Sequence, residues 1–171
     1  MLKLKVYYKL FDPKCDFTIN PKGEMIDLCV RDELVAKAPT YRAVNQYQKA
    51  REVVCNSVKF NLGIAMKMPK GMEAEVKARS STFDKYGLIL TNGVGEIDSS
   101  YCGNNDEWKA EFLCTKDVTI PKYARLVQFK IAPGMFCNFL TRLRYALFGL
   151  VFIQVPELSD KDRGGFGSTG V

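Results

Sequence analysis

The sequence predicts a mostly β, single-domain protein that carries two helical segments. Three segments alternate apolar and polar residues, as strands with one buried face do; they are residues 2–8, 58–68 and 72–78. Shorter apolar runs separated by turn residues follow them, which indicates further short strands. The chain has 171 residues, of which 47% are hydrophobic. This size and composition predict one substantial core and one domain.

The predicted strands follow one another along most of the chain. The first carries Leu2, Leu4, Val6 and Tyr8 on one face. Between the second and the third strand, the tripeptide Pro69-Lys70-Gly71 predicts a turn. Further strands are expected at residues 88–91, 109–114, 118–120, 125–131 and 151–155.

Two segments have helical instead of alternating periodicity. Pro39-Thr40 can begin a helix, and apolar residues then recur at near-helical spacing: Tyr41, Val44, Tyr47, Ala50 and Val54. The second predicted helix covers Met135 to Leu147 and has an apolar face made of Phe136, Phe139, Leu140, Leu143 and Leu147. It is too short and too charged to span a bilayer. Packing on the β body or at a subunit interface is favoured over a peripheral membrane helix, so no membrane partner is expected.

Composition excludes several kinds of chemistry. The chain has no histidine, so a His-based triad or His metal site is excluded and a carboxylate is the expected base. None of the six cysteines forms a CxxC pair, which argues against zinc. Without a signal peptide they are expected to be reduced thiols in the cytoplasm. The net charge of +6 suits a polyanionic partner or solubility alone, and the scattered basic residues do not predict a nucleic-acid surface.

The C-terminal sequence RGGFGSTGV, from Arg163 to Val171, combines four glycines with an arginine, a phenylalanine and two hydroxyl side chains. Glycine lets backbone N–H groups crowd an anion, and the guanidinium and hydroxyls add donors for phosphate oxygens. Phe166 is then free to stack on a planar group such as a base. We expect residues 1–161 to form the domain and residues 162–171 a flexible phosphate-binding lid. A disordered Gly/Ser tail is the alternative.

Five segments together resemble the trimeric dUTPase family. In chain order they are GEMIDLCVRDE around Asp27, ARSST from Ala78, TNGVGEIDSSYCG from Thr91, ARLVQFKI from Ala124 and DRGGFGSTG from Asp162. The resemblance runs from about Ile19 to the C-terminus. It implies an all-β, jelly-roll-like β-barrel, with two inserted helices, that assembles as a homotrimer.

The resemblance also implies an activity, a dUTP diphosphatase that hydrolyses dUTP to dUMP and pyrophosphate. Asp98 matches the family's catalytic carboxylate, which orients and deprotonates the water that attacks the α-phosphate. Tyr101 matches the tyrosine that packs beneath the deoxyribose and leaves no room for a 2′-hydroxyl. Asn92, with the backbone of Glu96 and Ile97, matches the uracil-binding positions.

Phosphate binding is implied for the remaining motifs. The residues concerned are Arg79, Ser80 and Ser81 of the second motif, Gln128 of the fourth, and Arg163, Phe166, Gly167, Ser168 and Thr169 of the fifth. Asp27 would help to hold the active-site water and the Mg²⁺ shell. Mg²⁺ itself is expected to be bound by the triphosphate and water, with no protein ligands. The motifs converge only across subunit boundaries in the family, so three composite sites per trimer are implied.

Two other functions remain open at this stage. dCTP deaminases share the fold and much of the second and third motifs, and Glu111 could supply their catalytic glutamate, in a deaminase or a bifunctional enzyme. A non-catalytic, dUTPase-like regulatory protein could use the inserted helices to bind a protein partner. The chain also departs from the family pattern: Glu24-Met25-Ile26 replaces the usual small residues before Asp27, and the residues Asn104 to Asp106 are extra after the third motif.

Overall fold

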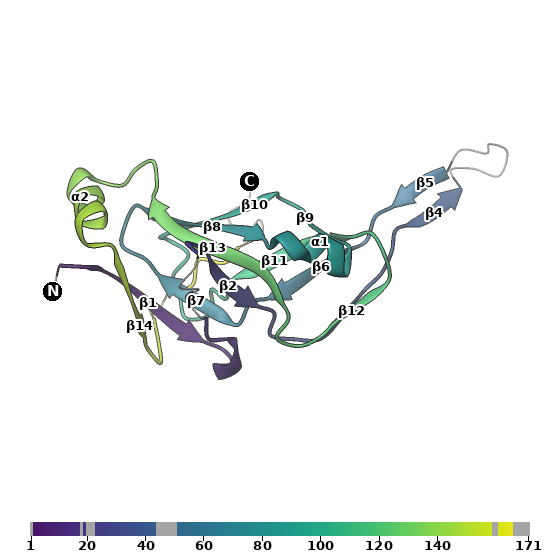
Figure 1. The fold of residues 1–171 in the computed structure, drawn as a ribbon, viewed down its shortest axis with the longest axis horizontal. Helices are drawn as coiled ribbons and strands as arrows, with labels where there is room; N and C mark the ends of the chain where they lie inside the picture. Colours follow the sequence, from purple (N-terminus) through teal and green to yellow (C-terminus); the bar gives the residue numbers. More distant parts are fainter. Residues whose placement is uncertain (1, 18, 20–22, 44–50, 159–160, 166–171) are drawn as a thin grey trace.

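The computed structural model describes residues 2–17, 19, 23–43, 51–158 and 161–165; for residues 41–43, 51 and 52 it describes the backbone alone. Figure 1 shows an elongated molecule made mainly of strands, with the β4–β5 hairpin at one end and helix α2 at the other. In chain order the elements are β1 (Leu4–Leu10), a 3₁₀ turn (Pro13–Cys15), β2 (Ile26–Cys29), β3 (Leu34–Ala36), β4 (Thr40–Ala43), β5 (Arg51–Val54), β6 (Ser57–Asn61), β7 (Ile64–Lys67), β8 (Met72–Ala78), α1 (Ser80–Tyr86), β9 (Leu88–Leu90), β10 (Val94–Asp98), β11 (Lys109–Cys114), β12 (Val118–Ile120), β13 (Arg125–Pro133), α2 (Phe139–Phe148) and β14 (Leu150–Gln154).

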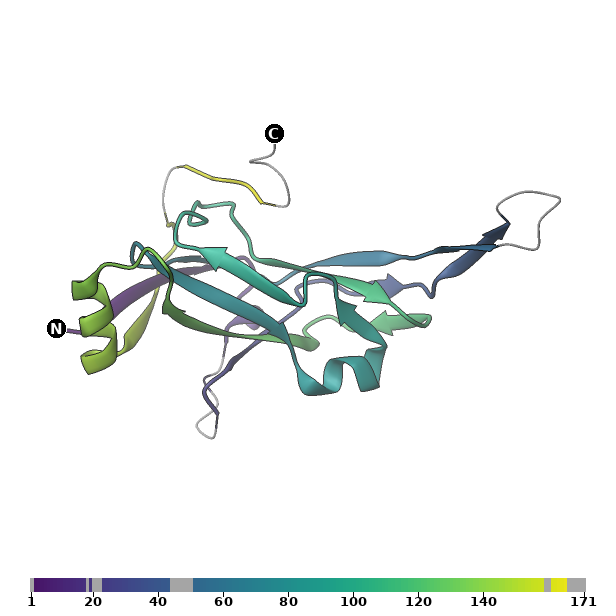
Figure 2. The same ribbon diagram turned by 90° about the horizontal axis from the view of Figure 1, so that it is seen from above.

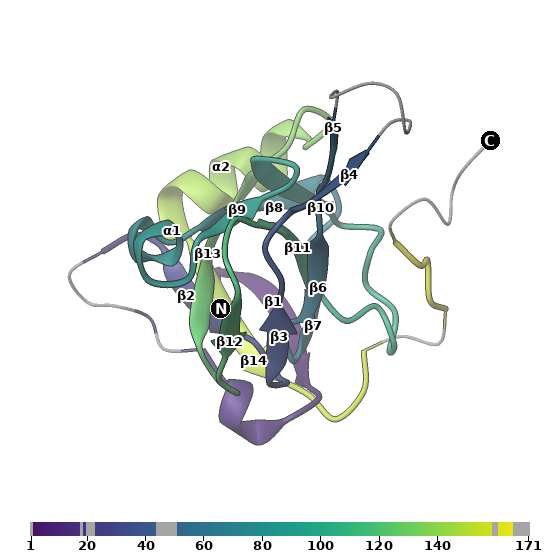
Figure 3. The ribbon, with the colours of Figure 1, turned by 90° about the vertical axis from the view of Figure 1, so that its right-hand side faces the viewer.

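One antiparallel sheet carries most of the predicted motifs. Its strand order is β10-β8-β13-β2, so β10 and β2 form its two edges. A second sheet, in the order β14-β1-β7, joins the two ends of the chain, because β1 pairs in parallel with β14. The third sheet places β11 between β6 and β9. The end-on view in Figure 3 shows these strands gathered around one interior.

The core is built from the inward faces of these strands and is rich in aromatic rings. Trp108, Phe60, Phe112 and Phe129 are fully buried. The Trp108 and Phe129 rings meet edge to face with centroids 5.3 Å apart, an arrangement that aromatic quadrupoles favour. The alternation along β13 buries one face of the strand, and the other face, which carries Gln128, is left for the candidate site.

The predicted mostly β fold is confirmed, with one strand divided. The segment predicted as a single strand over residues 58–68 forms β6 and β7, which belong to different sheets. The division falls at Gly63, whose φ of +70° lies in the left-handed region. A Cβ at this position would lie 2.5 Å from Cβ of Cys15, so the backbone there has room for glycine alone. The apolar alternation continued through this bend and did not reveal it.

The predicted helix that begins at Pro39-Thr40 is wrong. The described parts of this region form β4 and β5, which pair antiparallel with Thr40 opposite Val54 and Tyr41 opposite Val53. Threonine, tyrosine and valine are all strand-favouring residues, and their preference outweighs the weak helical spacing. Val44, Tyr47 and Ala50 lie outside the described residues. The insertion is therefore a β arm, which extends from the body in Figures 1 and 2.

The second predicted helix is confirmed as α2, and it begins at Phe139 instead of Met135. The Asn138 side chain caps it by accepting a hydrogen bond from the backbone N–H of Thr141 at 2.9 Å. Tyr145 ties the helix to the body, because its hydroxyl donates to the carbonyl of Ile131 at 3.0 Å. The expected apolar face is largely open on the single chain, since Phe139 is 74% exposed. Its location at a subunit interface stays a prediction.

Candidate active site

A cavity of about 440 Å³ lies beside edge strand β10 and gathers most residues of the third motif. It is lined on one side by Asn92, Glu96, Ile97, Asp98 and Tyr101, and on the other by β11 and by Arg163, Gly164 and Gly165. The sequence predicted six of these residues for one site, namely Asn92, Glu96, Ile97, Asp98, Tyr101 and Arg163. The structure brings all six together.

Asp98 is the last residue of β10, and its carboxylate faces Ser100 and Arg163. The backbone N–H of Ser100 donates to Oδ1 at 2.7 Å, and the Ser100 hydroxyl donates to the same oxygen. Nη1 of Arg163 lies 2.6 Å from Oδ2. Partial burial raises the pKa of Asp98, but the Ser100 hydrogen bonds and then Arg163 outweigh it, so the pKa lies below its usual value. The group is therefore a carboxylate at neutral pH.

Tyr101 lies three residues after Asp98 and forms part of the cavity wall. Its hydroxyl donates to the carbonyl of Glu107 at 3.0 Å, which fixes the ring. Burial raises the pKa of Tyr101, with further contributions from nearby carboxylates, so the phenol stays neutral. The C-terminal segment passes close to the ring, because a Cβ on Gly165 would lie 3.3 Å from the Tyr101 ring. A side chain at position 165 would therefore be tightly placed against the ring.

Residues that follow the third motif hold the C-terminal segment in place. Asp106 is 1% exposed and accepts hydrogen bonds from the backbone N–H groups of Arg163 and Gly164, each at 2.9 Å at its shortest. Asn105 donates to both carboxylate oxygens of Asp162 at 2.7 Å. Figure 2 shows the C-terminal segment, in yellow, passing beside the loop after β10. The sequence pattern marked residues 104–106 only as extra and gave them no role.

A second cluster collects the first, second and fourth motifs at the other edge of the sheet. Asp27 on β2 accepts from two arginines: Nε of Arg79 lies 2.8 Å from Oδ1, and Nη1 of Arg125 lies 3.3 Å from Oδ2. Gln128 on β13 is directly opposite Asp27 in the register. The sequence analysis did not predict Arg125 as a site residue. Its place in the fourth motif and its positive charge were the signal that could have identified it.

Ser80 and Ser81 begin helix α1, which the alternation did not predict. Arg79 precedes the helix in an extended conformation, and Gly87 ends it in the left-handed region. Thr82 anchors the first turn, because its buried hydroxyl donates to the carbonyl of Leu126 at 2.7 Å. The two serines therefore lie next to Arg79 at the start of a short helix fixed on β13.

The two clusters are far apart within one chain. They are separated across the sheet by three strand spacings, about 14 Å in total. Along the strands, Asp98 is opposite Glu73 of β8. Asp27 is opposite Gln128, which is itself opposite Lys77 of β8. The two carboxylates are therefore offset along the strand direction by the distance from Glu73 to Lys77, about 13 Å. The two carboxylates are therefore about 20 Å apart on the sheet. One chain cannot close both clusters around one phosphate group.

Glu111 lines the cavity, yet its carboxylate is already engaged. The Ser57 hydroxyl donates to Oε1 at 2.7 Å, and Nζ of Lys59 lies 3.7 Å from Oε2. Both partners come from the neighbouring strand β6. A deaminase would need this group to exchange protons with the base, so its two contacts would have to give way first.

Within the part of the chain that the structure describes, no three His, Cys, Asp or Glu side chains form a group that could hold a metal ion. Four of the residues predicted for the lid lie outside the described residues: Phe166, Gly167, Ser168 and Thr169. None of the described helices is long and apolar enough to cross a membrane.

Known proteins resemble this chain over most of its length. It is 35% identical over 169 residues, 99% of both chains, to the SPbeta prophage-derived deoxyuridine 5′-triphosphate nucleotidohydrolase YosS of Bacillus subtilis strain 168. It is also 34% identical, over 64% of this chain and 67% of the relative, to the deoxyuridine 5′-triphosphate nucleotidohydrolase of Hydrogenobaculum sp. strain Y04AAS1. No protein-family model matches the chain.

Solved structures share the fold at low sequence identity. A dUTPase from Streptococcus mutans matches with a TM-score of 0.62 and 22% identity, over 77% of this chain and 98% of its own. The G164S mutant of the Staphylococcus bacteriophage 80alpha dUTPase, solved with dUpNHpp, matches with a TM-score of 0.55 and 16% identity over 97% of this chain and 98% of its own.

Proposed function

Because this chain belongs to the dUTPase family, we propose that it is a dUTP diphosphatase, which hydrolyses dUTP to dUMP and pyrophosphate. The observation that carries the proposal is the cavity in which Asp98, Tyr101 and Asn92 meet beside Arg163. This set offers a base for water, a wall for the sugar and donors for the nucleobase. No histidine is needed for any of these roles.

The nucleobase would be recognised mainly by the backbone of β10. Among the described residues this strand pairs with β8 alone, so its other edge has main-chain donors and acceptors available on the side of the cavity. Uracil presents a matching alternation of carbonyl acceptors and an N–H donor. The Asn92 side chain adds an amide at the end of this edge. Tyr101, held by its bond to Glu107, would then pack against the deoxyribose and exclude a 2′-hydroxyl.

The chemical step would be attack of water on the α-phosphorus. Asp98 accepts the proton as the water oxygen forms its bond, and the bond to the bridging oxygen breaks so that pyrophosphate leaves. The lowered pKa of Asp98 keeps the base ionised beforehand. Arg163 occupies Oδ2 of this carboxylate at 2.6 Å, so it must turn toward the phosphates before the oxygen is available. When bound with the triphosphate, Mg²⁺ supplies charge neutralisation for the leaving pyrophosphate.

The phosphates would be held by Arg79, Ser80, Ser81 and Gln128 of another subunit. The separation of about 20 Å between the two clusters of one chain supports this arrangement. A homotrimer with three composite sites would bring the Arg79 cluster of one subunit to the Asp98 cavity of the next. Asp27, clamped by Arg79 and Arg125, would orient those arginines and the water shell of the cation.

We also propose that the protein works in the cytoplasm and acts on the free nucleotide. Four of the six cysteines, Cys15, Cys29, Cys114 and Cys137, are buried thiols that form no disulfide, as in proteins kept in a reducing compartment. No nucleic-acid or membrane partner is required.

The test is the release of pyrophosphate and ammonia from dUTP, dCTP, dTTP and UTP with Mg²⁺. We expect pyrophosphate from dUTP alone. Asp98→Asn should lower kcat by at least about a hundredfold, because it removes the base, while Asp84→Asn on the exposed face of α1 should leave kcat unchanged. Ammonia from dCTP would instead assign the cavity to a deaminase that uses Glu111. No reaction with any nucleotide would leave a regulatory binding protein.

A further inference from the structure

Helix α2 and the loop before it carry an apolar face that the rest of the described chain leaves open. All five of its side chains are exposed, and Phe136 is exposed by 91%. Single exposed apolar residues are ordinary, but several on one face form a patch that marks an interaction surface. The partner of this face therefore has to come from outside the chain. The face consists of Phe136, Phe139, Leu140, Leu143 and Leu147.

Hydrogen bonds hold the loop that presents Phe136. The Arg142 guanidinium donates to the carbonyl of Cys137 at 3.0 Å and to the carbonyl of Gly134. The N–H of Gly134 donates to the carbonyl of Gly71, in the turn between β7 and β8, at 2.9 Å. A Cβ on Gly71 would lie 2.6 Å from Cα of Cys137, so the loop packs closely on this turn. The exposure of Phe136 is thus a built feature of the fold.

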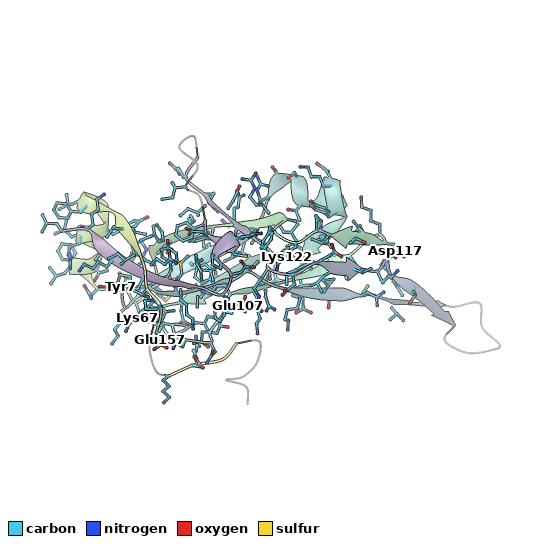
Figure 4. The ribbon with its side chains drawn as sticks, turned by 90° about the horizontal axis from the view of Figure 1, so that it is seen from below. Tyr7, Lys67, Glu107, Asp117, Lys122 and Glu157 are labelled. Carbon is cyan, nitrogen blue, oxygen red and sulfur yellow. The ribbon has the colours of Figure 1, made fainter. Side chains whose placement is uncertain are left out.

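A basic pocket of about 530 Å³ lies next to this face. Arg144 of α2 lines the pocket and donates to the carbonyl of Leu2, from Nε at 3.4 Å and from Nη2 at 3.2 Å. Tyr7 on β1 is opposite Lys67 on β7, and Figure 4 shows both on the side of the molecule nearest α2. No Asp or Glu of the described residues lines the pocket. Its five cations are Lys3, Lys5, Lys67, Lys70 and Arg144.

The apolar face and the basic pocket form one continuous surface. Arg144 comes four residues after Leu140 and three before Leu147, so the three side chains lie on the same side of α2. Both leucines are largely exposed. The sequence from Met135 to Phe148 contains no acidic residue that would offset the positive charge. This surface lies at the α2 end of the elongated molecule in Figure 1.

We propose that this surface binds an anionic lipid bilayer, with α2 lying in the interface. A helix that lies in the interface directs Phe and Leu toward the acyl chains and Lys and Arg toward the headgroups. The negative potential of anionic lipids attracts each cation, which strengthens binding about fivefold per residue. The sequence analysis expected no membrane partner, because the sequence did not reveal that the apolar face stays open or that the pocket adjoins it.

Charge and polarity favour a bilayer over other partners. Lysine is depleted in protein–protein interfaces, and four of the five cations are lysines. A nucleic acid would pair with the cations but would leave the five apolar side chains in water. The inference is independent of the proposed function, because the basic pocket and the Asp98 cavity share no lining residue.

Co-sedimentation of the full chain with lipid vesicles tests the proposal. We expect binding to vesicles of equal parts phosphatidylglycerol and phosphatidylcholine at about 0.1 M salt, and no binding to phosphatidylcholine alone. Lys5→Gln should weaken binding about fivefold. Lys116→Gln, in the exposed turn between β11 and β12, should leave it unchanged. Equal binding to both kinds of vesicle, or binding to neither, would overturn the proposal.

Substitutions on α2 test whether its apolar face enters the bilayer. Phe139→Ser should weaken binding about tenfold or more, because it removes a ring that would be buried among acyl chains. Phe83→Ser, which removes an exposed ring from α1, is the matched control and should have no effect. Phe139→Trp should show blue-shifted emission with anionic vesicles and quenching by brominated acyl chains, above the constant emission of the buried Trp108. Phe83→Trp should show neither change.

Other partners would give different results, and each of these would refute the proposal. If Lys5→Gln weakens binding and Phe139→Ser does not, a polyanion binds the cations and α2 stays outside it. If Phe139→Ser turns an oligomer into a monomer in analytical ultracentrifugation, a second copy of the chain covers the face. The urea midpoint of Phe139→Ser should equal that of the wild type, because the side chain is exposed, and this excludes misfolding as the cause of lost binding.

Discussion

At the scale of the residue, two kinds of partner hold Asp98 in its charged form, one from its own turn and one from the C-terminal segment. Ser100 lies two residues away on the same turn and donates twice to Oδ1. Arg163 comes from the C-terminal segment and binds Oδ2. In the proposed cycle the serine would stay in place, whereas the arginine would leave the carboxylate in order to bind phosphate. Ser100 is then the residue that sets the pKa of the working base.

Ser100→Ala should therefore move the acidic limb of the kcat/KM profile to higher pH. The substitution removes the hydroxyl donor that lowers the pKa of Asp98, so protonation begins at a higher pH. The measurement is kcat/KM for dUTP across the acidic range. Ser99→Ala is the matched control, because the Ser99 hydroxyl bonds the N–H of Gly71 and not Asp98. If the acidic limb of the kcat/KM profile does not move in Ser100→Ala, Asp98 is not the group that titrates.

The lowered pKa of Asp98 also makes the stability of the fold depend on pH. Because the folded-state pKa of Asp98 is lowered, its carboxylate stabilises the fold at pH values above its ordinary pKa. That contribution is lost as the pH falls through the lowered folded-state value. Asp98→Asn should thus narrow the difference in unfolding free energy between neutral and acidic pH.

At the scale of the element, single glycines decide where strands end. Gly63→Ala should lower the unfolding free energy by about 2–4 kcal/mol, because it adds left-handed strain and a clash with Cys15. Gly93→Ala is the matched control: its φ is +65°, but a Cβ there would meet nothing within 4 Å. The control should cost only about 1 kcal/mol. If urea unfolding shows that Gly63→Ala and Gly93→Ala lower the unfolding free energy equally, Cys15 moves aside at no cost.

Helix α2 should contribute to stability without affecting catalysis. Asn138→Ala removes the side chain that caps Thr141 and should cost about 1 kcal/mol of unfolding free energy. Activity toward dUTP should not change, because α2 contributes no residue to the Asp98 cavity. Asn138→Asp keeps an acceptor and should retain the stability. Loss of activity in Asn138→Ala would connect α2 to the site.

The sequence predicted those elements whose pattern depends on burial and missed those fixed by local or distant geometry. Alternation identified β1 and β8, because each buries every second residue over most of its length. It failed at Gly63, where a left-handed φ divides the strand without changing the apolar pattern. It failed again between Thr40 and Val54, where strand-favouring residues pair with each other and not with the core.

At the scale of the whole molecule, the site depends on an order of strands that no motif encodes. The third motif predicted its own cavity, since Asn92 to Tyr101 are local in sequence. Sequence alone did not predict that β8 and β13 lie between Asp98 and Asp27. Nor did it predict that the extra residues around Asp106 meet the C-terminal segment, because such contacts join positions 57 and 58 residues apart.

The net charge of +6 makes a prediction for the whole molecule as well. A basic protein draws an anionic substrate over the screening length, which falls from about 10 Å at 0.1 M salt to about 3 Å at 1 M. We therefore expect kcat/KM for dUTP to fall several-fold over this range while kcat changes little, because screening slows encounter and not the chemical step.

Two lysine variants locate the charge responsible for this effect. Lys109→Gln removes a cation from the wall of the Asp98 cavity and should flatten the dependence on salt. Lys37→Gln removes the same charge from an exposed pair with Asp117 on the β3 side and should leave the slope unchanged. If both variants flatten it equally, the net charge attracts the substrate as a whole. If only Lys109→Gln does, the field is focused at the cavity, and the cations at its mouth act on substrate capture before any of them touches a phosphate.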